Sequence, residues 1–339
     1  MRRFLWLSLC VLVLASIAVA SSAGVDARSD LDPLTSMSAQ ARGSFDMSPA
    51  WSPDGRLVAF ARSTELANGD FRDAVYIVSV ESGEQRVLAA GDAPSLSPDG
   101  SRITFHVWWG GNGIYTVKLD GTGRRRLTKL SDSYPRWSPD GKNILFWRKP
   151  PGDVALGATP LFVVPSSGGS ARRVGFASEG DAEWSPDGTR IVFWAEFHAG
   201  ETAIMVVGRN GRGLRNLGYG AWPSWSPDGR DIAFTYAEDG FGIRLMRSDG
   251  SHVRRLGAGW LPHFSPTGRE LSFSIEPGDG AIWIMRVDGS HRRRLTQPPA
   301  RQSDHDEAWS PDGRKLVFVR GNRIWVTNSN GTNARPLSH

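Results

Sequence analysis

A five-residue sequence, Trp-Ser-Pro-Asp-Gly, constrains the fold of this chain more than any other feature. The seven serines of its copies follow one another at intervals of 45, 41, 47, 41, 39 and 45 residues. Proline fixes φ, serine can bond back to the backbone, and glycine accepts a positive φ, so each copy is predicted to form a tight corner. A period of about forty residues with a turn in each repeat is typical of a β-propeller with one blade per repeat. Complete copies stand at residues 51–55, 137–141, 184–188, 225–229 and 309–313, and altered copies at 96–100 and 264–268.

Each repeat also contains four strand-like segments. In the third repeat they are residues 133–137, 143–147, 161–164 and 171–174, and a glycine-rich turn that suits a hairpin joins the last two. Four antiparallel strands in each of seven repeats predict an all-β fold, a seven-bladed β-propeller. Most of the tryptophans are expected to fill the gaps between blades. The predicted blades are residues 44–89, 90–129, 130–176, 177–218, 219–257, 258–298 and 299–339.

The amino-terminal region differs from the repeats. Residues 1–20 combine a basic start, an apolar run and small residues before Ser21, which is typical of a signal peptide cleaved after Ala20. We therefore predict an extracytoplasmic location, secreted, periplasmic or in the cell envelope, with an uncleaved anchor as the alternative. No later segment is apolar enough to span a membrane. Residues 21–43 are predicted to be a flexible linker, in which the tetrapeptide at 32–35 resembles the ends of later repeats and could add a strand that latches the last blade.

Net charge does not identify a partner. The formal charge is +5, and two of the basic residues, Arg2 and Arg3, lie in the predicted leader. Basic runs near the ends of several repeats would suit phosphate groups. They are predicted to fall on the outermost strand of a blade, however, where charge protects a free edge from pairing with another chain. We therefore expect no nucleic-acid partner, and we expect a monomer. The runs are residues 124–126, 172–173, 254–255 and 292–294.

The repeats over residues 44–339 resemble those of the TolB β-propeller family, and they are similar to the propeller domain of prolyl-oligopeptidase-like proteins. TolB has a six-bladed ring and an additional amino-terminal α/β domain, whereas this chain has seven repeats preceded by a short linker. The resemblance implies an extracytoplasmic propeller whose ring mouth docks a protein or a peptide.

Familiar catalytic motifs do not occur in the sequence. A serine hydrolase of the oligopeptidase kind needs a Gly-x-Ser-x-Gly elbow on a second, α/β domain, and neither is present. The chain also has no glycine-rich phosphate loop, no His-Glu-x-x-His and no pair of cysteines. The sequence therefore predicts a binding protein rather than an enzyme of these classes, and no organic cofactor.

Acidic and aromatic residues precede several corners, where the innermost strand of a blade lines the central channel. Several carboxylates around one mouth would focus a negative potential. We predict that the mouth binds a protein or peptide through the basic side chains of that partner. The alternatives are a divalent cation, for which oxygen ligands are suited, and a purely structural role in which the carboxylates bond backbone amides or water. The predicted partner-binding residues are Asp46, Asp132, Asp181, Trp222, Trp260, Asp304, His305, Asp306 and Glu307, and Asp92, Glu179, Glu183 and His263 lie in equivalent stretches.

Other functions for the same mouth stay open at this point. A metal-assisted polysaccharide lyase or hydrolase would use the acidic residues, and the propeller could instead be a partner subunit for a separate catalytic domain. Exposed aromatic residues, Trp108 and Trp109 beside glycines as well as Trp222 and Trp260, could bind a glycan.

Overall fold

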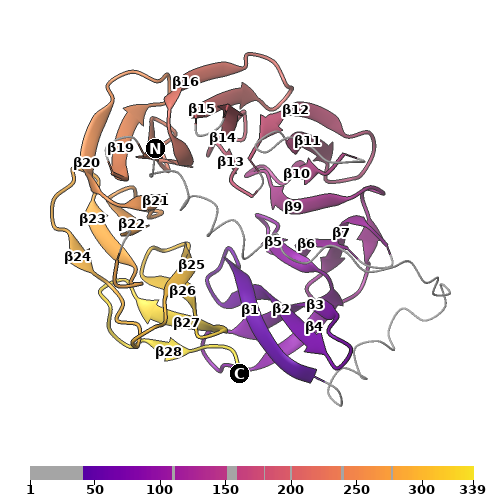
Figure 1. Ribbon diagram of the computed structural model, residues 1–339. Coiled ribbons are helices and arrows are strands. Elements are labelled where there is room, and N and C mark those ends of the chain that lie inside the picture. The colour runs from indigo at the N-terminus through magenta and orange to yellow at the C-terminus, as the bar shows by residue number, and fades with distance from the viewer. Residues whose placement is uncertain are drawn as a thin grey trace. The chain divides into compact units, whose positions relative to one another are not determined.

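The computed structural model describes residues 41–339 except 109–110, 151–158, 179, 199–200, 238–239 and 276–277. The predicted leader, the tetrapeptide at 32–35, Trp109 and Glu179 lie outside the described residues. The described strands form seven four-stranded sheets, each made of four consecutive antiparallel strands. These sheets, numbered as blades 1 to 7 in chain order, stand around a common axis (Figure 1). The seven-bladed β-propeller predicted from the sequence is confirmed. Within the described ranges, no helix has the length and apolar character that crossing a membrane requires.

Every blade begins on the axis and ends at the rim. The innermost strands are β1 (Ala41–Trp51), β5 (Asp92–Leu96), β9 (Asp132–Trp137), β13 (Glu183–Trp184), β17 (Ala221–Trp225), β21 (Trp260–Phe264) and β25 (Asp304–Trp309). The second strands are β2 (Leu57–Leu66), β6 (Arg102–Val107), β10 (Asn143–Arg148), β14 (Arg190–His198), β18 (Asp231–Tyr236), β22 (Glu270–Ser274) and β26 (Lys315–Arg320).

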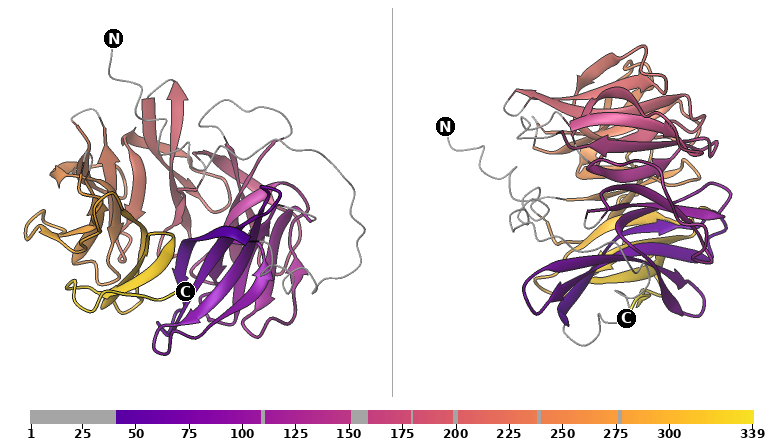
Figure 2. Two further views of the ribbon diagram at one scale, coloured as in Figure 1. Left: turned by 60° about the horizontal axis from the view of Figure 1, so that its bottom comes forward. Right: turned by 90° about the vertical axis from the view of Figure 1, so that its right-hand side faces the viewer.

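The outer half of each blade is a second hairpin. The third strands are β3 (Phe71–Ser79), β7 (Gly113–Lys118), β11 (Thr159–Pro165), β15 (Glu201–Gly208), β19 (Gly242–Arg247), β23 (Trp283–Arg286) and β27 (Arg323–Asn328). The outermost strands are β4 (Gln85–Ala90), β8 (Arg125–Arg126), β12 (Arg172–Ala177), β16 (Arg215–Tyr219), β20 (Arg254–Ala258), β24 (Arg293–Arg294) and β28 (Arg335–Pro336). Figure 2 shows the same strands from two further directions.

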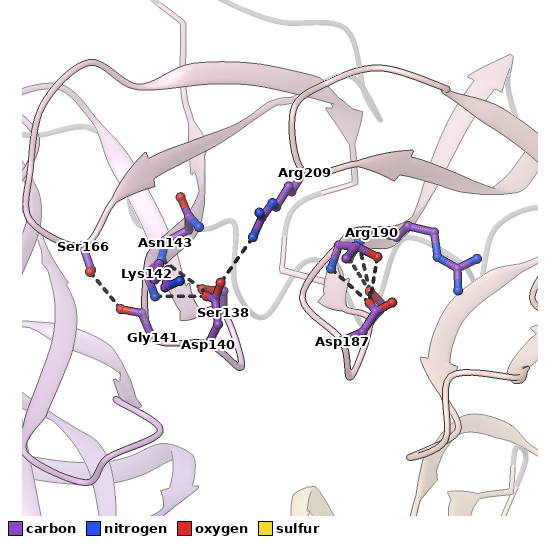
Figure 3. A network of polar contacts seen from close by, with 11 residues as sticks. Ser138, Asp140, Gly141, Lys142, Asn143, Ser166, Asp187, Arg190 and Arg209 are labelled. Atoms are coloured by element: carbon purple, nitrogen blue, oxygen red, sulfur yellow. Dashed lines mark hydrogen bonds and ion pairs between the residues drawn. The ribbon is translucent and has the colours of Figure 1, made fainter.

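The repeated pentapeptide forms the corner between the first and second strands, as predicted. In blade 3 the Ser138 hydroxyl donates to Asp140 Oδ1 at 2.6 Å, and the same oxygen accepts from the backbone N–H of Lys142 at 3.0 Å (Figure 3). The hydrogen bond from Ser138 holds the pKa of Asp140 below its usual value. Gly141 closes the corner at a φ of 68°, which a residue with a side chain adopts only at a cost. The corner is therefore specified by local chemistry alone.

The corners also contact one another around the axis. A Cβ added at Gly100 would lie 3.6 Å from Pro53 of the preceding corner, and the six other corner glycines face the preceding proline in the same way. The series closes on itself, because Gly55 in blade 1 faces Pro311 in blade 7 at 3.8 Å. This contact joins the two ends of the propeller, and among the described strands the four of blade 7 all come from residues 304–336.

Seven hydrophobic clusters fill the gaps between neighbouring blades, and the corner aromatic residue or leucine of the following blade takes part in each. Trp184 thus packs between blades 3 and 4, and Trp51 between blades 7 and 1. Burial of a large apolar side chain contributes about 1.5–3 kcal/mol. The predicted position of the tryptophans between blades is confirmed, and each pair of neighbouring blades shares its own hydrophobic cluster.

The outer rim carries a second set of links. The predicted basic runs lie on outermost strands, as expected. Several of these arginines reach the hairpin of the next blade: Arg125 Nη2 donates to Ser166 O at 2.7 Å, and Arg254 Nη2 to Val287 O at 2.9 Å. Arg335 makes the matching bond to the Val80 carbonyl, from the last blade to the first. The arginines therefore connect blades in addition to placing charge at the edges.

Candidate functional site

One end of the central channel is built by the start of each innermost strand. We call this region the mouth, and it comprises in each blade the positions five, four and three residues before the corner aromatic residue or leucine. Six blades have a left-handed backbone at the third of these positions, with φ between 49° and 53°, and none of the six residues is glycine. A register shift in the first strand accompanies each. The six residues are Ser48, Ala93, Tyr134, Trp222, Leu261 and Asp306.

This strained conformation has a structural cause. The left-handed turn directs the backbone N–H of Leu261 to Thr235 Oγ1 of the preceding blade at 3.0 Å, and that of Tyr134 to His106 Nδ1 at 3.4 Å. Because a non-glycine residue in this region carries a cost of about 1 kcal/mol or more, the bulge is held by its surroundings. At Leu261 and Tyr134 the bulge is accordingly held by a hydrogen bond to the preceding blade.

Three of the predicted site residues are buried in ion pairs. Asp46, Asp132 and Asp304 have side chains with no exposed surface, and each is the cross-strand partner of an arginine sixteen residues later. Both carboxylate oxygens accept from the guanidinium, which also lies over an aromatic ring of the third strand. The Nε to Oδ1 distances are 2.6 Å for Arg62 and Asp46, 2.7 Å for Arg148 and Asp132, and 2.6 Å for Arg320 and Asp304.

These pairs brace the first two strands of blades 1, 3 and 7. Blades 2, 5 and 6 have glycine where these three blades have aspartate. Gly91, Gly220 and Gly259 each pack directly against a phenylalanine of the second strand. Breaking a buried ion pair leaves an uncompensated charge and is strongly destabilising. The geometry therefore gives Asp46, Asp132 and Asp304 a structural partner within the chain, and direct contact between them and a ligand stays a prediction.

The acidic half of the mouth lies on blades 7, 1 and 2. Asp92 at the start of β5 is 15% exposed, and burial, followed by the charge of Asp306, raises its pKa to about 6. Burial and the charge of Asp92 also raise the pKa of Asp73 at the start of β3. His106 on β6 is fully buried, and burial lowers its pKa to about 4, so the ring is neutral at pH 7. The side chains of this half act on one another electrostatically and form one cluster.

Blade 7 supplies the most exposed part of this half. His305 and Asp306 are about half exposed, with 3.6 Å between Nδ1 and Oδ1. The hydrogen bond to Asp306 raises the pKa of His305 despite its partial burial. Glu307 follows them, and its Oε1 is buried without a hydrogen-bond partner. The predicted stretch of blade 7 therefore does lie at the mouth.

The opposite half of the mouth is aromatic. Trp222 and Trp260 contact each other edge to face, with ring centroids 5.6 Å apart. Trp194 of blade 4 continues the series at 5.4 Å from Trp222, and Phe241 at 6.4 Å from Trp260. Asp181 accepts from Trp194 Nε1 at 3.1 Å, and burial raises its pKa. The structure therefore brings Trp222, Trp260 and Asp181 together, as the prediction of a partly aromatic mouth requires.

Charged groups continue two residues further into the channel, one position before the corner aromatic residue or leucine. Glu183 accepts from the backbone N–H of Trp225 at 3.0 Å, and burial raises its pKa. Arg136 and His263 are exposed and act electrostatically on Glu183. This layer therefore contains both acidic and basic side chains.

A metal centre has no support in the geometry. Among the residues that the structure describes, no group of three or more His, Cys, Asp or Glu side chains is arranged to hold a metal ion. The acidic residues at the mouth instead bond to arginine, histidine, tryptophan or backbone groups. The alternative of a metal-assisted lyase or hydrolase therefore gains nothing from the described site. Trp108, named for glycan binding, packs against His106 with ring centroids 4.7 Å apart.

Sequence reasoning missed three residues of the mouth, His106, Asp73 and Trp194. Each lies on the second or third strand of its blade, whereas the search covered only the stretches before the corners. A usable signal was the cross-strand register, because His106 pairs directly with Asp92. Counting away from the corner on both strands, with one extra residue allowed for the bulge in the first strand, would have brought these two residues together.

The fold defines a class of protein: a seven-bladed β-propeller, here with polar and aromatic side chains gathered at one end of its axis. The model of the TolB beta propeller domain family matches residues 25–259, and the chain belongs to this family.

Individual relatives cover parts of the chain. It is 41% identical to the Tol-Pal system protein TolB of Anaeromyxobacter dehalogenans over 98 residues, 27% of this chain and 21% of that protein. It is 34% identical to an uncharacterized protein of Agrobacterium fabrum over 106 residues, 28% of this chain and 33% of that protein. The chain thus spans a third or less of the length of these curated relatives.

Solved structures support the fold. A protein assigned as TolB from Agrobacterium tumefaciens is 27% identical, with a TM-score of 0.51 over 65% of this chain and 86% of that chain. The β-propeller domain of the Trilobed protease from Pyrococcus furiosus, described as having an open velcro topology, is 13% identical, with a TM-score of 0.64 over 88% of this chain and 97% of that chain. At that identity the second likeness shows the fold alone.

Proposed function

We propose that the chain is a non-enzymatic, extracytoplasmic scaffold that recognises a protein or peptide at the acidic mouth of its channel. The observation that carries the proposal is the two-sided mouth, in which Asp92 and Asp306 lie on one half and Trp222 and Trp260 on the other. Buried aromatic side chains combined with a few charged groups are typical of the residues that dominate binding energy in protein interfaces. The strained backbone around the mouth holds these groups in place before a partner arrives.

The cellular setting of this proposal rests on two arguments. Residues 1–20 have the pattern of a secretory signal peptide, and one relative is named as the TolB protein of the Tol-Pal system. Both favour a protein of the cell envelope that works with other proteins. A glycan ligand is a weaker candidate, because the Trp222 and Trp260 rings meet at an interplanar angle of 83° and so do not form one flat surface on which a sugar ring could stack.

Site-specific crosslinking tests the proposal. A photoreactive amino acid replaces His305, which is exposed at the mouth, and in a control it replaces Arg314, which is exposed in the corner of the same blade at the other end of β25. We expect one partner to be captured from position 305 in cells and not from position 314. Equal capture at both positions, or capture at 314 alone, would place the binding surface elsewhere.

A further inference from the structure

The acidic half of the mouth would bind a cation, and the aromatic half would bind an apolar group. This inference rests on the proposed function. In the acidic half, Asp92, Asp73 and Asp306 act on one another as like charges. Two histidines lie close to them: His305, about half exposed, beside Asp306, and the neutral, buried His106 beside Asp92. Like charges gathered in a partly buried place are stabilised by a cation that joins them.

His106 provides a second observation, independent of the carboxylates. Its side chain is fully buried, and its Nε2 has no hydrogen-bond partner although it lies 3.9 Å from Asp92 Oδ2. Because Nδ1 accepts from the backbone N–H of Tyr134, the neutral ring carries its proton on Nε2. A buried donor without an acceptor is costly. The Nε2–H of His106 gains an acceptor when the ionised Asp92 carboxylate moves within hydrogen-bond distance of it.

The aromatic half also contains a buried hydrogen-bond donor that has no acceptor. Trp260 Nε1 is buried and has no partner, while the ring of Trp260 contacts Trp222 and Phe241. Trp222 is held at a φ of 51°. A large apolar side chain with a neighbouring carbonyl would satisfy both the rings and the indole N–H.

We propose that the mouth takes a peptide segment that carries a basic residue close to an aromatic or aliphatic one. The guanidinium or ammonium group lies between Asp92 and Asp306, and the apolar side chain lies against Trp222 and Trp260. His106 acts as a positioning residue, donating from Nε2 to the ionised Asp92 carboxylate. Asp73 adds to the negative potential from β3.

Binding on this scheme depends on pH. Asp92 must be ionised to hold a cation, and its pKa in the free protein is about 6. Acidification protonates Asp92 and also charges His305, whose pKa is raised by Asp306, and the raised pKa of Asp73 acts in the same direction. His106 stays neutral down to about pH 4. Protonation of Asp92 and charging of His305 therefore both lower the affinity for a cation as the pH falls from 7.5 to 5.

Calorimetric titration with blocked peptides tests the inference. Each peptide contains one arginine and one tryptophan separated by zero, one or two glycines, and its partner contains citrulline, which has the shape of arginine without the charge. We expect at least one arginine peptide to bind tenfold or more tightly than its citrulline partner at pH 7.5, and the difference to vanish at pH 5.

Variants locate the contact. Asp92→Asn and Asp306→Asn should each bring the arginine peptide to the affinity of the citrulline peptide, whereas Glu81→Gln, at an exposed residue of the β3–β4 hairpin, should not. Asn is well suited to the left-handed φ of position 306, so this variant should fold. His106→Phe, which keeps a planar ring but has no N–H, should move the midpoint of the pH profile upward, since the ionised Asp92 loses its donor.

Each contrary result has a definite meaning. Equal binding of arginine and citrulline peptides overturns the cation site and leaves the mouth as a binding surface. Failure of every peptide to bind at millimolar concentration overturns the inference as well, and the crosslinking pattern of position 305 against 314 then decides separately whether the proposed function stands.

Discussion

Replacing Asp92 by asparagine should make the protein more stable, in a way that depends on pH. Burial raises the pKa of Asp92 from 3.8 to about 6. Between these values the folded chain keeps the proton while the unfolded chain has released it. Stability contributed by this group therefore falls as the pH rises from about 4 to 6, and it stays low above that window. Asparagine keeps the shape of the side chain and removes the charge.

The size of the effect follows from the same shift. A pKa that rises from 3.8 to about 6 corresponds to about 3 kcal/mol between the two ends of the titration. The Asp92 side chain is only 15% exposed, so solvent screening takes away little of this. We expect Asp92→Asn to increase the free energy of unfolding by about 2–3 kcal/mol at pH 8 and to change it little at pH 4.

Urea-induced unfolding, followed by tryptophan fluorescence from pH 4 to pH 8, measures the difference directly. Glu81→Gln serves as the control, since its side chain is exposed. A variant that is less stable than the parent chain at pH 8, or equally stabilised at pH 4 and pH 8, would refute the reasoning that the ionised Asp92 is held at a cost. If Asp92 serves binding at the expense of stability, Asp92→Asn should both raise the free energy of unfolding and weaken peptide binding.

Two further changes test the packing that shapes the mouth. Gly220→Ala should lower the free energy of unfolding by about 2–4 kcal/mol, because the new Cβ would lie 2.5 Å from the Phe234 ring. Gly218 is the control, since it also has a positive φ but a Cβ there would have no atom within 4 Å. Gly218→Ala should therefore lower the free energy of unfolding by only about 1 kcal/mol, and urea titrations measure both variants. Asp304→Asn should cost about 3–5 kcal/mol because Arg320 stays buried without its partner, and thermal unfolding should show most of this recovered when Asp304→Leu is combined with Arg320→Met.

The sequence predicts the fold well because the signal is local and repeated. A corner such as residues 138–141 is specified by its own serine, proline, aspartate and glycine, and the same hydrogen bonds recur in the other repeats. The strands on either side follow from that corner. Seven equal repeats then leave one arrangement in which every blade covers the apolar face of the next, and the seven clusters between blades follow this arrangement.

The site was harder to predict because it depends on register between strands. Sequence position alone placed Asp46, Asp132 and Asp304 near the mouth, but their neighbours are set by pairing across the first hairpin. The signal was present in the same three repeats, each of which has an arginine sixteen residues later. The pairing of His106 with Asp92 could be found in this way, but its contact with Tyr134 could not, because that contact crosses from one blade to the next.

In a chain made of repeats, a position that departs from the pattern needs its own explanation. Two residues before the corner, five repeats have proline and one has alanine, whereas blade 7 has Glu307. Proline and alanine suit this position, which is buried in most of the blades. Glu307 places there a carboxylate whose Oε1 has no hydrogen-bond partner, which lowers stability. Since Glu307 directly follows His305 and Asp306, the departures gather in one stretch at the mouth. The other six blades keep the favourable residue at this position, so the fold tolerates a less stable stretch in blade 7. We infer that this stretch is kept for binding, at the same mouth where Asp92 places its charge.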